Sequence, residues 1–116
     1  MTESATYRLF LRAMEERKPV GCLYDGHARA LCPIILGRSD GAEKALVWQF
    51  AGEAERGRVP DWKCFYLAKV AGPQLVEAPW NAGPGPRGAA QSCVKEVDVD
   101  VNPNSPYRPK RRLSWQ

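Results

Sequence analysis

The segment "WKCFYLAKV", residues 62–70, carries side chains that could bind an anion. As an extended strand it places two lysines and two apolar residues on one face, because successive side chains point to opposite sides. These residues are Lys63, Phe65, Leu67 and Lys69. A nucleobase needs an apolar surface to stack on and a phosphate needs a nearby cation, and this face offers both. The alternative is that the apolar pair packs under a helix while the lysines extend to solvent. The opposite face is expected to pack as core, through Trp62, Cys64, Tyr66 and Val70.

The end of the chain is a second candidate for anion binding. The net charge is +4, and four cations lie within the last ten residues: Arg108, Lys110, Arg111 and Arg112. Residues 1–107 carry thirteen basic and thirteen acidic residues, so the basic excess belongs to this tail. Together with Tyr107 and Trp115, the four cations could neutralise phosphates and stack on bases. The alternative is a solvated tail that aids solubility.

The cysteines and the histidine do not indicate a metal or catalytic site. Four cysteines stand far apart without a C-x-x-C pair, and there is one histidine: Cys22, Cys32, Cys64, Cys93 and His27. A zinc site would have to gather ligands from separate segments, and a histidine in a turn is usually solvated. With no export signal, disulfides are not expected, and the cysteines are read as buried free thiols. The sequence therefore predicts neither enzyme activity nor a cofactor.

The elements that position these residues begin with a helix over 5–18. Tyr7, Phe10, Leu11 and Met14 form one apolar stripe, with Ser4 as the cap and Pro19 as the stop. Two Asp-Gly pairs follow, at 25–26 and 40–41, and Asp-Gly between apolar segments favours a type I′ hairpin turn. They predict an antiparallel meander of strands near 19–24, 28–37 and 45–51, with a bulge at Pro33.

The second half of the chain predicts further short strands and a tail. Segment 62–70 is the fourth strand, 73–80 is a candidate fifth, and 93–101 alternates cleanly as the last strand. In that last strand the valines are expected to face the core and Asp98 and Asp100 the solvent. The stretch 81–90 is a proline–glycine loop, and residues 102–116 read as a disordered basic tail. One helix and five or six short antiparallel strands indicate a small, strongly bent barrel or sandwich.

Two stretches resemble a known family. In "LYDGHARALCP", residues 23–33, a strand ends at Tyr24, and Arg29, Leu31 and Pro33 follow the turn at alternate positions. In "KCFYLAKV", residues 63–70, the pattern is basic-x-Phe-x-Leu-x-basic-aliphatic. Together they resemble the WYL domain, an Sm/SH3-like β-barrel found mostly in bacterial regulators. The triplet that names the family is absent, and a single helix cannot form the winged helix-turn-helix that usually precedes it. The chain therefore resembles a stand-alone WYL-like domain.

The resemblance implies a fold, a function and a set of site residues. It implies a mainly β protein in which residues 1–101 form an N-terminal helix and a five-stranded SH3/Sm-like barrel. It implies a ligand-binding or regulatory module for an anionic ligand, a nucleotide or single-stranded nucleic acid. The binding residues would be Tyr24, Arg29, Lys63, Phe65 and Lys69. The alternative function is a protein-interaction subunit that uses an exposed sheet edge. No apolar run is long enough for a membrane span, so the expected location is cytoplasmic.

Overall fold

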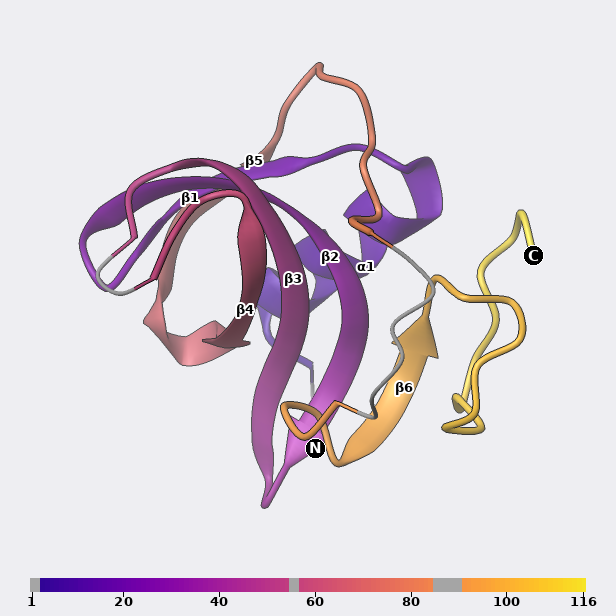
Figure 1. Ribbon diagram of the computed structural model, residues 1–116. Coiled ribbons are helices and arrows are strands. Elements are labelled where there is room, and N and C mark those ends of the chain that lie inside the picture. Colours follow the sequence, from indigo (N-terminus) through magenta and orange to yellow (C-terminus); the bar gives the residue numbers. More distant parts are fainter. Residues whose placement is uncertain (1–2, 55–56, 85–90) are drawn as a thin grey trace.

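In the part of the chain that the structure describes, one α-helix is combined with one antiparallel sheet (Figure 1). A computed structural model describes residues 3–54, 57–84 and 91–116. Its elements are α1 (Ala5–Glu16), β1 (Val20–Tyr24), β2 (His27–Ser39), β3 (Ala42–Gly52), β4 (Asp61–Tyr66), the 3-10 helix η1 (Leu67–Lys69), β5 (Val70–Leu75) and β6 (Glu96–Asp100). The predicted mainly β class with an N-terminal helix is confirmed. No helix in the described ranges has the length and apolar character needed to cross a membrane.

Helix α1 begins as predicted and ends slightly earlier than predicted. The Ser4 hydroxyl accepts a hydrogen bond from the Tyr7 N–H, which satisfies one free donor of the first turn. The helix ends before Arg17, which adopts the left-handed conformation (φ 52°), so the chain turns away before Pro19. The side chains that α1 buries include Tyr7, Phe10 and Met14. This stripe packs against β2, β5 and η1.

Both Asp-Gly turns form as predicted. Asp25 and Gly26 have φ of 51° and 85°, and Asp40 and Gly41 have φ of 53° and 85°. These positive values are the geometry that a type I′ turn requires. The turns place β1 and β3 on either side of β2, and the β2–β3 register shifts next to Pro33, where a bulge was predicted.

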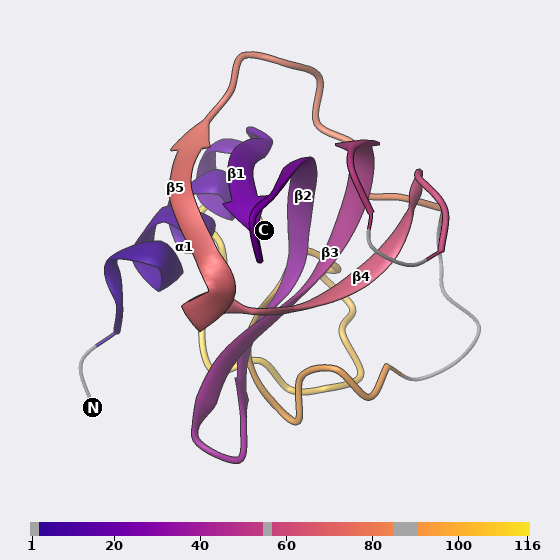
Figure 2. The same cartoon turned by 90° about the vertical axis from the view of Figure 1, so that its left-hand side faces the viewer.

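The sheet is strongly curved but open, so the predicted closed barrel is corrected. Five strands run in the order β4-β3-β2-β1-β5, and β6 pairs with the far half of the long strand β2. Figure 2 shows this order, with α1 beside β5. Closure would need a ladder between β4 and β5, but within the described residues β4 pairs with β3 and β5 pairs with β1, and the two do not pair with each other. They are instead consecutive along the chain and joined by η1, which interrupts the single strand predicted over 62–70.

The segment 102–116 has no helix or strand, yet it packs on the domain, which differs from the predicted disordered tail. Leu113 is 3% exposed and belongs to the main core cluster. The Trp115 indole N–H donates to the Met14 carbonyl oxygen (3.0 Å). The segment also lies against β6, since the Arg111 N–H donates to the Asp98 carbonyl oxygen (3.0 Å). Asp98 and Asp100 are consequently buried, where the alternation in β6 had predicted a solvent-facing side.

A disulfide joins two of the four cysteines, which corrects the prediction that all four are free thiols. Cys64 on β4 is bonded to Cys93, with a Cα–Cα distance of 5.6 Å. Cys22 and Cys32 are buried free thiols, as predicted. The sequence separation of 29 residues leaves no local pattern from which this pair could be inferred.

Candidate anion-binding site

The face of β4 that was expected to bind a ligand is part of the core. Phe65 is 1% exposed and Leu67 is 2% exposed, and both lie in the main core cluster with α1. Tyr66, expected in the core, is instead 45% exposed. The predicted open patch is therefore corrected in favour of the alternative: the apolar pair packs under the helix. Phe65 cannot offer a free ring face to a stacked base, because the Tyr24 ring already covers it at a centroid distance of 3.8 Å.

Arg29 lies deep in the curved end of the sheet, next to these two rings. Its side chain is on the inner face of β2, and the residue is 7% exposed. The guanidinium carbon lies 5.4 Å from the centroid of the Tyr24 ring and 5.7 Å from that of Phe65. The fold thus brings together three of the residues predicted for the site, from β1, β2 and β4.

The local backbone of β2 and β3 allows this placement. Gly52 is opposite Arg29 in the β2–β3 ladder and has φ of 94°. A Cβ at Gly52 would lie 2.4 Å from the Ala28 carbonyl oxygen, so only glycine fits this close approach. Gln49, with no exposed surface, donates to the main-chain oxygens of Ala51 (3.2 Å) and Glu53 (2.8 Å). These bonds fix the amide so that its oxygen faces Arg29.

The Arg29 guanidinium has no carboxylate partner among the residues that the structure describes. Its Nη1 donates to the Gln49 Oε1 (2.9 Å), and its Nε is buried without a hydrogen-bond partner. Desolvating a guanidinium costs several kcal/mol. A hydrogen bond to a charged group offsets about 1.5–3 kcal/mol and a desolvated cation–π contact about 2 kcal/mol. An anion that reaches this group would therefore find a positive charge whose desolvation is largely complete.

Cys22 is opposite Arg29 in the β1–β2 ladder and reports on its charge. Burial raises the pKa of the Cys22 thiol to about 11, and the nearby Arg29 guanidinium acts in the opposite direction. A thiol with this pKa is protonated at neutral pH and is a poor nucleophile. The cluster around Arg29 is thus suited to binding rather than to covalent chemistry.

An exposed aromatic ring with two cations adjoins this cluster. The Nζ of Lys44 lies 4.4 Å from the centroid of the Tyr66 ring, and the Nζ of Lys69 lies 5.6 Å from it. Neither lysine pairs with an acid in the described part of the chain. The Tyr66 main-chain N–H donates to the Tyr24 hydroxyl (2.9 Å), which connects the ring to the Arg29 cluster. Of the predicted cations, Lys69 thus joins the site, while Lys63 on β4 already has an interaction partner.

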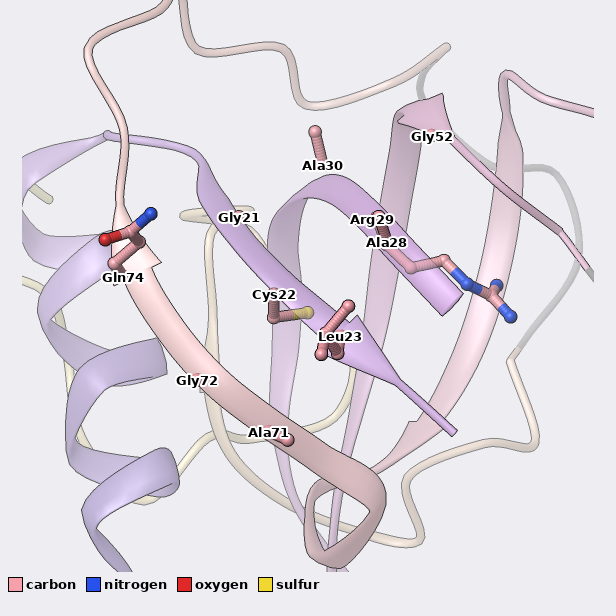
Figure 3. A pocket seen from close by; sticks show the side chains of 10 residues that line it. All are labelled: Gly21, Cys22, Leu23, Ala28, Arg29, Ala30, Gly52, Ala71, Gly72 and Gln74. Carbon is pink, nitrogen blue, oxygen red and sulfur yellow. The ribbon is translucent and has the colours of Figure 1, made fainter. Parts of the chain in front are cut away.

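A second feature, on the outer side of the same strands, is a shallow hollow of about 470 Å³ that spans β5, β1 and β2 (Figure 3). It is lined mainly by glycine and alanine, with Cys22, Leu23, Arg29 and Gln74 as the larger residues. Figure 3 shows the Arg29 side chain leaving β2 on the side away from Gln74. The hollow is therefore a mainly apolar surface that borders Arg29, whose guanidinium extends away from Gln74.

The predicted cations of the tail are mostly engaged by groups of the domain. Arg111 pairs with Glu3 (3.2 Å), and Lys110 lies 3.7 Å from an Asp98 oxygen. Arg112 donates to the Gln116 main-chain oxygen (3.2 Å), which leaves Arg108 without such a partner within residues 3–54, 57–84 and 91–116. The tail lies on the opposite side of the molecule from the β1–β2 hairpin (Figure 1). The structure therefore does not join the two predicted binding regions.

Sequence reasoning missed three residues of this site, namely Lys44, Gln49 and Tyr66. Arg29 was found through a motif, and its alternation with Leu31 also indicates a core-facing arginine. Nothing in the local pattern around Gln49 or Lys44 distinguishes them from ordinary strand residues, because their partners lie on other strands. Within the described residues, no group of three or more histidine, cysteine or acidic side chains could hold a metal ion. The predicted loop residues 85–90 lie outside the described residues.

Comparisons with known proteins return no match: no family model, no curated protein and no solved structure is similar to this chain. The resemblance to the WYL domain accordingly stays a prediction.

Proposed function

We propose that this protein is a non-enzymatic binding module for an anionic ligand, with Arg29 as the residue that receives the anion. The observation that carries the proposal is the buried Arg29 guanidinium, which pairs with an amide and two aromatic rings rather than with a carboxylate. A buried charge without a counter-ion is costly to keep in a folded protein. A ligand that brings its own negative charge would supply the missing counter-ion.

A nucleotide or a short single strand is the ligand class that the surrounding groups fit best. Such ligands combine a phosphate with a planar base, and they bind where cations and an aromatic side chain are close together. Tyr66, with Lys44 and Lys69 beside its ring, takes the role that the sequence had assigned to Phe65. A hollow of about 300 Å³ adjoins Tyr66; its lining includes the apolar residues Leu67 and Val70, and also Glu43, whose carboxylate accepts a hydrogen bond from the Ser4 N–H (3.0 Å).

The test is fluorescence anisotropy with short labelled single strands, and competition by mononucleotides, at low and high salt. Wild-type protein is expected to bind more weakly as salt rises, because phosphate contacts release counter-ions. Arg29→Met is expected to weaken binding about tenfold or more, because a charge-assisted hydrogen bond is lost. Arg12→Ala, which removes an exposed cation of α1 that is 63% exposed, is the matched control and is expected to bind like wild type.

The proposal is wrong if folded Arg29→Met binds as tightly as wild type. It is also wrong if Arg12→Ala loses as much affinity as Arg29→Met, since binding would then depend on net charge alone. Circular dichroism of each variant establishes that it is folded before binding is compared.

A second function, protein interaction through a sheet edge, is favoured by a different observation. Leu23 is 46% exposed beside the hollow, and among the described strands the neighbouring strand β5 pairs with β1 alone. An added strand could hydrogen-bond to such an edge. If this second function is correct, the labelled single-stranded nucleic acids will not bind even at low salt. A partner chain would then slow hydrogen exchange of the β5 amides, and Leu23→Asp would abolish that protection while Arg29→Met would not.

A further inference from the structure

The C-terminal segment folds around a cavity of its own. This cavity, about 270 Å³ in volume, is lined by three arginines together with polar groups of the same segment and the end of β6. The arginines are Arg108, Arg111 and Arg112. Because the segment lies on the opposite side of the molecule from the β1–β2 hairpin, this cavity is separate from the Arg29 site (Figure 1).

The positive charge around this cavity exceeds the negative charge that faces it. Asp100 is the carboxylate in the lining, it is 4% exposed, and its Oδ1 already accepts the Asn102 main-chain N–H (2.9 Å). Arg111 uses one nitrogen on Glu3, and Arg112 uses one on the Gln116 main-chain oxygen. Each guanidinium carries five N–H donors, so most of the donors around the cavity have no partner from the described chain.

Arg108 is held at the cavity in an unfavourable backbone conformation. Its φ is 53°, in the left-handed region that side chains other than glycine, asparagine and aspartate rarely adopt. The chain is fixed on both sides of it: the Tyr107 hydroxyl accepts the Gln91 N–H (3.0 Å), and the Arg111 N–H donates to the Asp98 oxygen (3.0 Å). Strained residues of this kind are found at ligand sites, where the strain places a functional group.

We propose that this cavity binds a phosphate group, either inorganic phosphate or a phosphomonoester. A phosphate is a dianion near neutral pH and presents several acceptor oxygens in a tetrahedral arrangement, which suits guanidinium groups that approach from different directions. A carboxylate has a single charge and two acceptor oxygens, so it would neutralise less of the charge of three arginines than a phosphate does. This site goes beyond the proposed function, because it depends neither on Arg29 nor on the rings beside it.

The test follows the amide NMR spectrum of the full chain during titration with inorganic phosphate, and in a second arm with phosphoserine. Shifts confined to residues around 100–116 are expected in wild-type protein. If phosphoserine binds more tightly than inorganic phosphate, the natural ligand is a phosphomonoester. If inorganic phosphate binds equally well or better, the free anion is the ligand.

Arg108→Gly separates a binding role from a structural one because its two expected effects have opposite signs. Glycine tolerates the positive φ, so the variant is expected to unfold at a higher Tm than wild type in the absence of phosphate. Loss of the guanidinium is expected to weaken phosphate binding about tenfold or more. Arg108→Asn, which also tolerates this conformation, is the second variant in case the glycine loosens the segment.

Two controls make the result decisive. Arg12→Ala removes the same charge at a distant exposed position, and Arg29→Met removes the other candidate anion site; both are expected to retain wild-type phosphate affinity. The proposal is overturned if Arg108→Gly and Arg108→Asn bind phosphate as wild type does. It is likewise overturned if Arg12→Ala loses as much affinity as they do, or if wild-type protein shows no localised shifts.

Discussion

Arg29 and Arg38 lie on the same strand, β2, and are surrounded in opposite ways. Arg38 lies 3.4 Å from an oxygen of Asp98 and 3.7 Å from an oxygen of Glu43, and its guanidinium lies over the Tyr7 ring. Arg29 also lies over aromatic rings, but its hydrogen-bond partner is the neutral amide of Gln49. Both arginines leave a buried Nε without a partner, so hydrogen-bond satisfaction does not distinguish them. The carboxylates do.

This difference separates a structural charge from one that is available to a ligand. Around Arg38, the Tyr7 hydroxyl donates to Asp98 (2.6 Å) and Lys110 lies 3.7 Å from the other Asp98 oxygen. Burial and the hydrogen bond to Asp98 raise the pKa of Tyr7, so this hydroxyl stays a donor. The network ties together α1, β2, β6 and the C-terminal segment. At Arg29 there is no comparable set of acids among the described residues, and an incoming anion would not have to displace one.

The largest effect is expected from breaking the acid-paired network with Asp98→Ala. The side chain of Asp98 is 8% exposed, and its removal leaves the Tyr7 hydroxyl without its acceptor and Arg38 with Glu43 alone as an acidic partner among the described residues. Removing one partner of a buried ion pair costs about 3–5 kcal/mol in the free energy of unfolding. Urea denaturation measures this cost. Glu77→Ala is the control, because that carboxylate is 86% exposed in its pair with Lys18 and should change stability by less than about 1 kcal/mol. Equal effects of the two variants would contradict the comparison.

The next effect is expected from Leu113→Ala, since the C-terminal segment covers the Arg38 region. Truncating a buried leucine costs about 2–5 kcal/mol, through lost apolar burial and the cavity left behind. Thermal or urea unfolding provides the measurement. The neighbouring exposed residue Arg112, changed to alanine, should leave stability within about 0.5 kcal/mol of wild type. A disordered segment, as the sequence had predicted, would make both variants neutral.

A smaller effect on stability is expected from Arg29→Met than from the same substitution at Arg38. Methionine removes the desolvated charge but leaves the Gln49 oxygen unbonded, at a cost of about 1–3 kcal/mol. These opposing changes should leave the free energy of unfolding within about 1 kcal/mol of wild type. Arg38→Met removes the cation that pairs with Asp98 and Glu43. It should lower the free energy of unfolding clearly more in the same urea experiment. If Arg29→Met proves the more damaging change, Arg29 is structural and the proposed site loses its basis.

Short-range sequence signals predict the structure of the first half of the chain well and that of the second half less well. The Ser4 cap, the two Asp-Gly turns and the irregularity at Pro33 all depend on neighbours in sequence, and the structure contains each of them. The prediction of which side of β4 faces the core was wrong, because apolar residues occupy both sides of this strand. Only the pairing of Phe65 with Ala45 in the core, a contact between strands, decides which side is inside.

The C-terminal segment and the site show where local signals are missing. Prolines and charges around Pro103 read as disorder, although Leu113 and Trp115 were apolar residues that needed a place to pack. The Cys64–Cys93 bond and the amide partner of Arg29 join segments distant in sequence, and composition carries no trace of either. In contrast, the alternation of Arg29 with Leu31 was visible in the sequence and would have placed Arg29 on the core face, although the prediction used it only as part of a motif.

The smallest expected effect uses the Cys22 thiol as a sensor of the Arg29 charge. Burial raises the pKa of Cys22 to about 11, and the positive charge of Arg29 counteracts part of this rise. In Arg29→Met the pKa should therefore increase further, by up to about one unit. The measurement is the ¹³Cβ shift of labelled cysteine against pH, with Cys22→Ala identifying the signal that belongs to Cys32.

The sign of the linked stability follows from the same pKa. A thiol whose pKa is higher in the folded state than in the unfolded state contributes stability below pH 9 that is lost as the pH rises toward 11. Arg29→Met should enlarge this loss and extend it to higher pH, because the folded thiol resists ionisation more strongly. An anion bound at Arg29 should act on Cys22 in the same direction as the substitution, since it screens the guanidinium. The opposite outcome is a Cys22 titration that is identical in wild type, in Arg29→Met and in wild type with nucleotide added. That result would contradict the comparison with Arg38, because it would show that the charge of Arg29 neither acts on Cys22 nor is reached by the ligand.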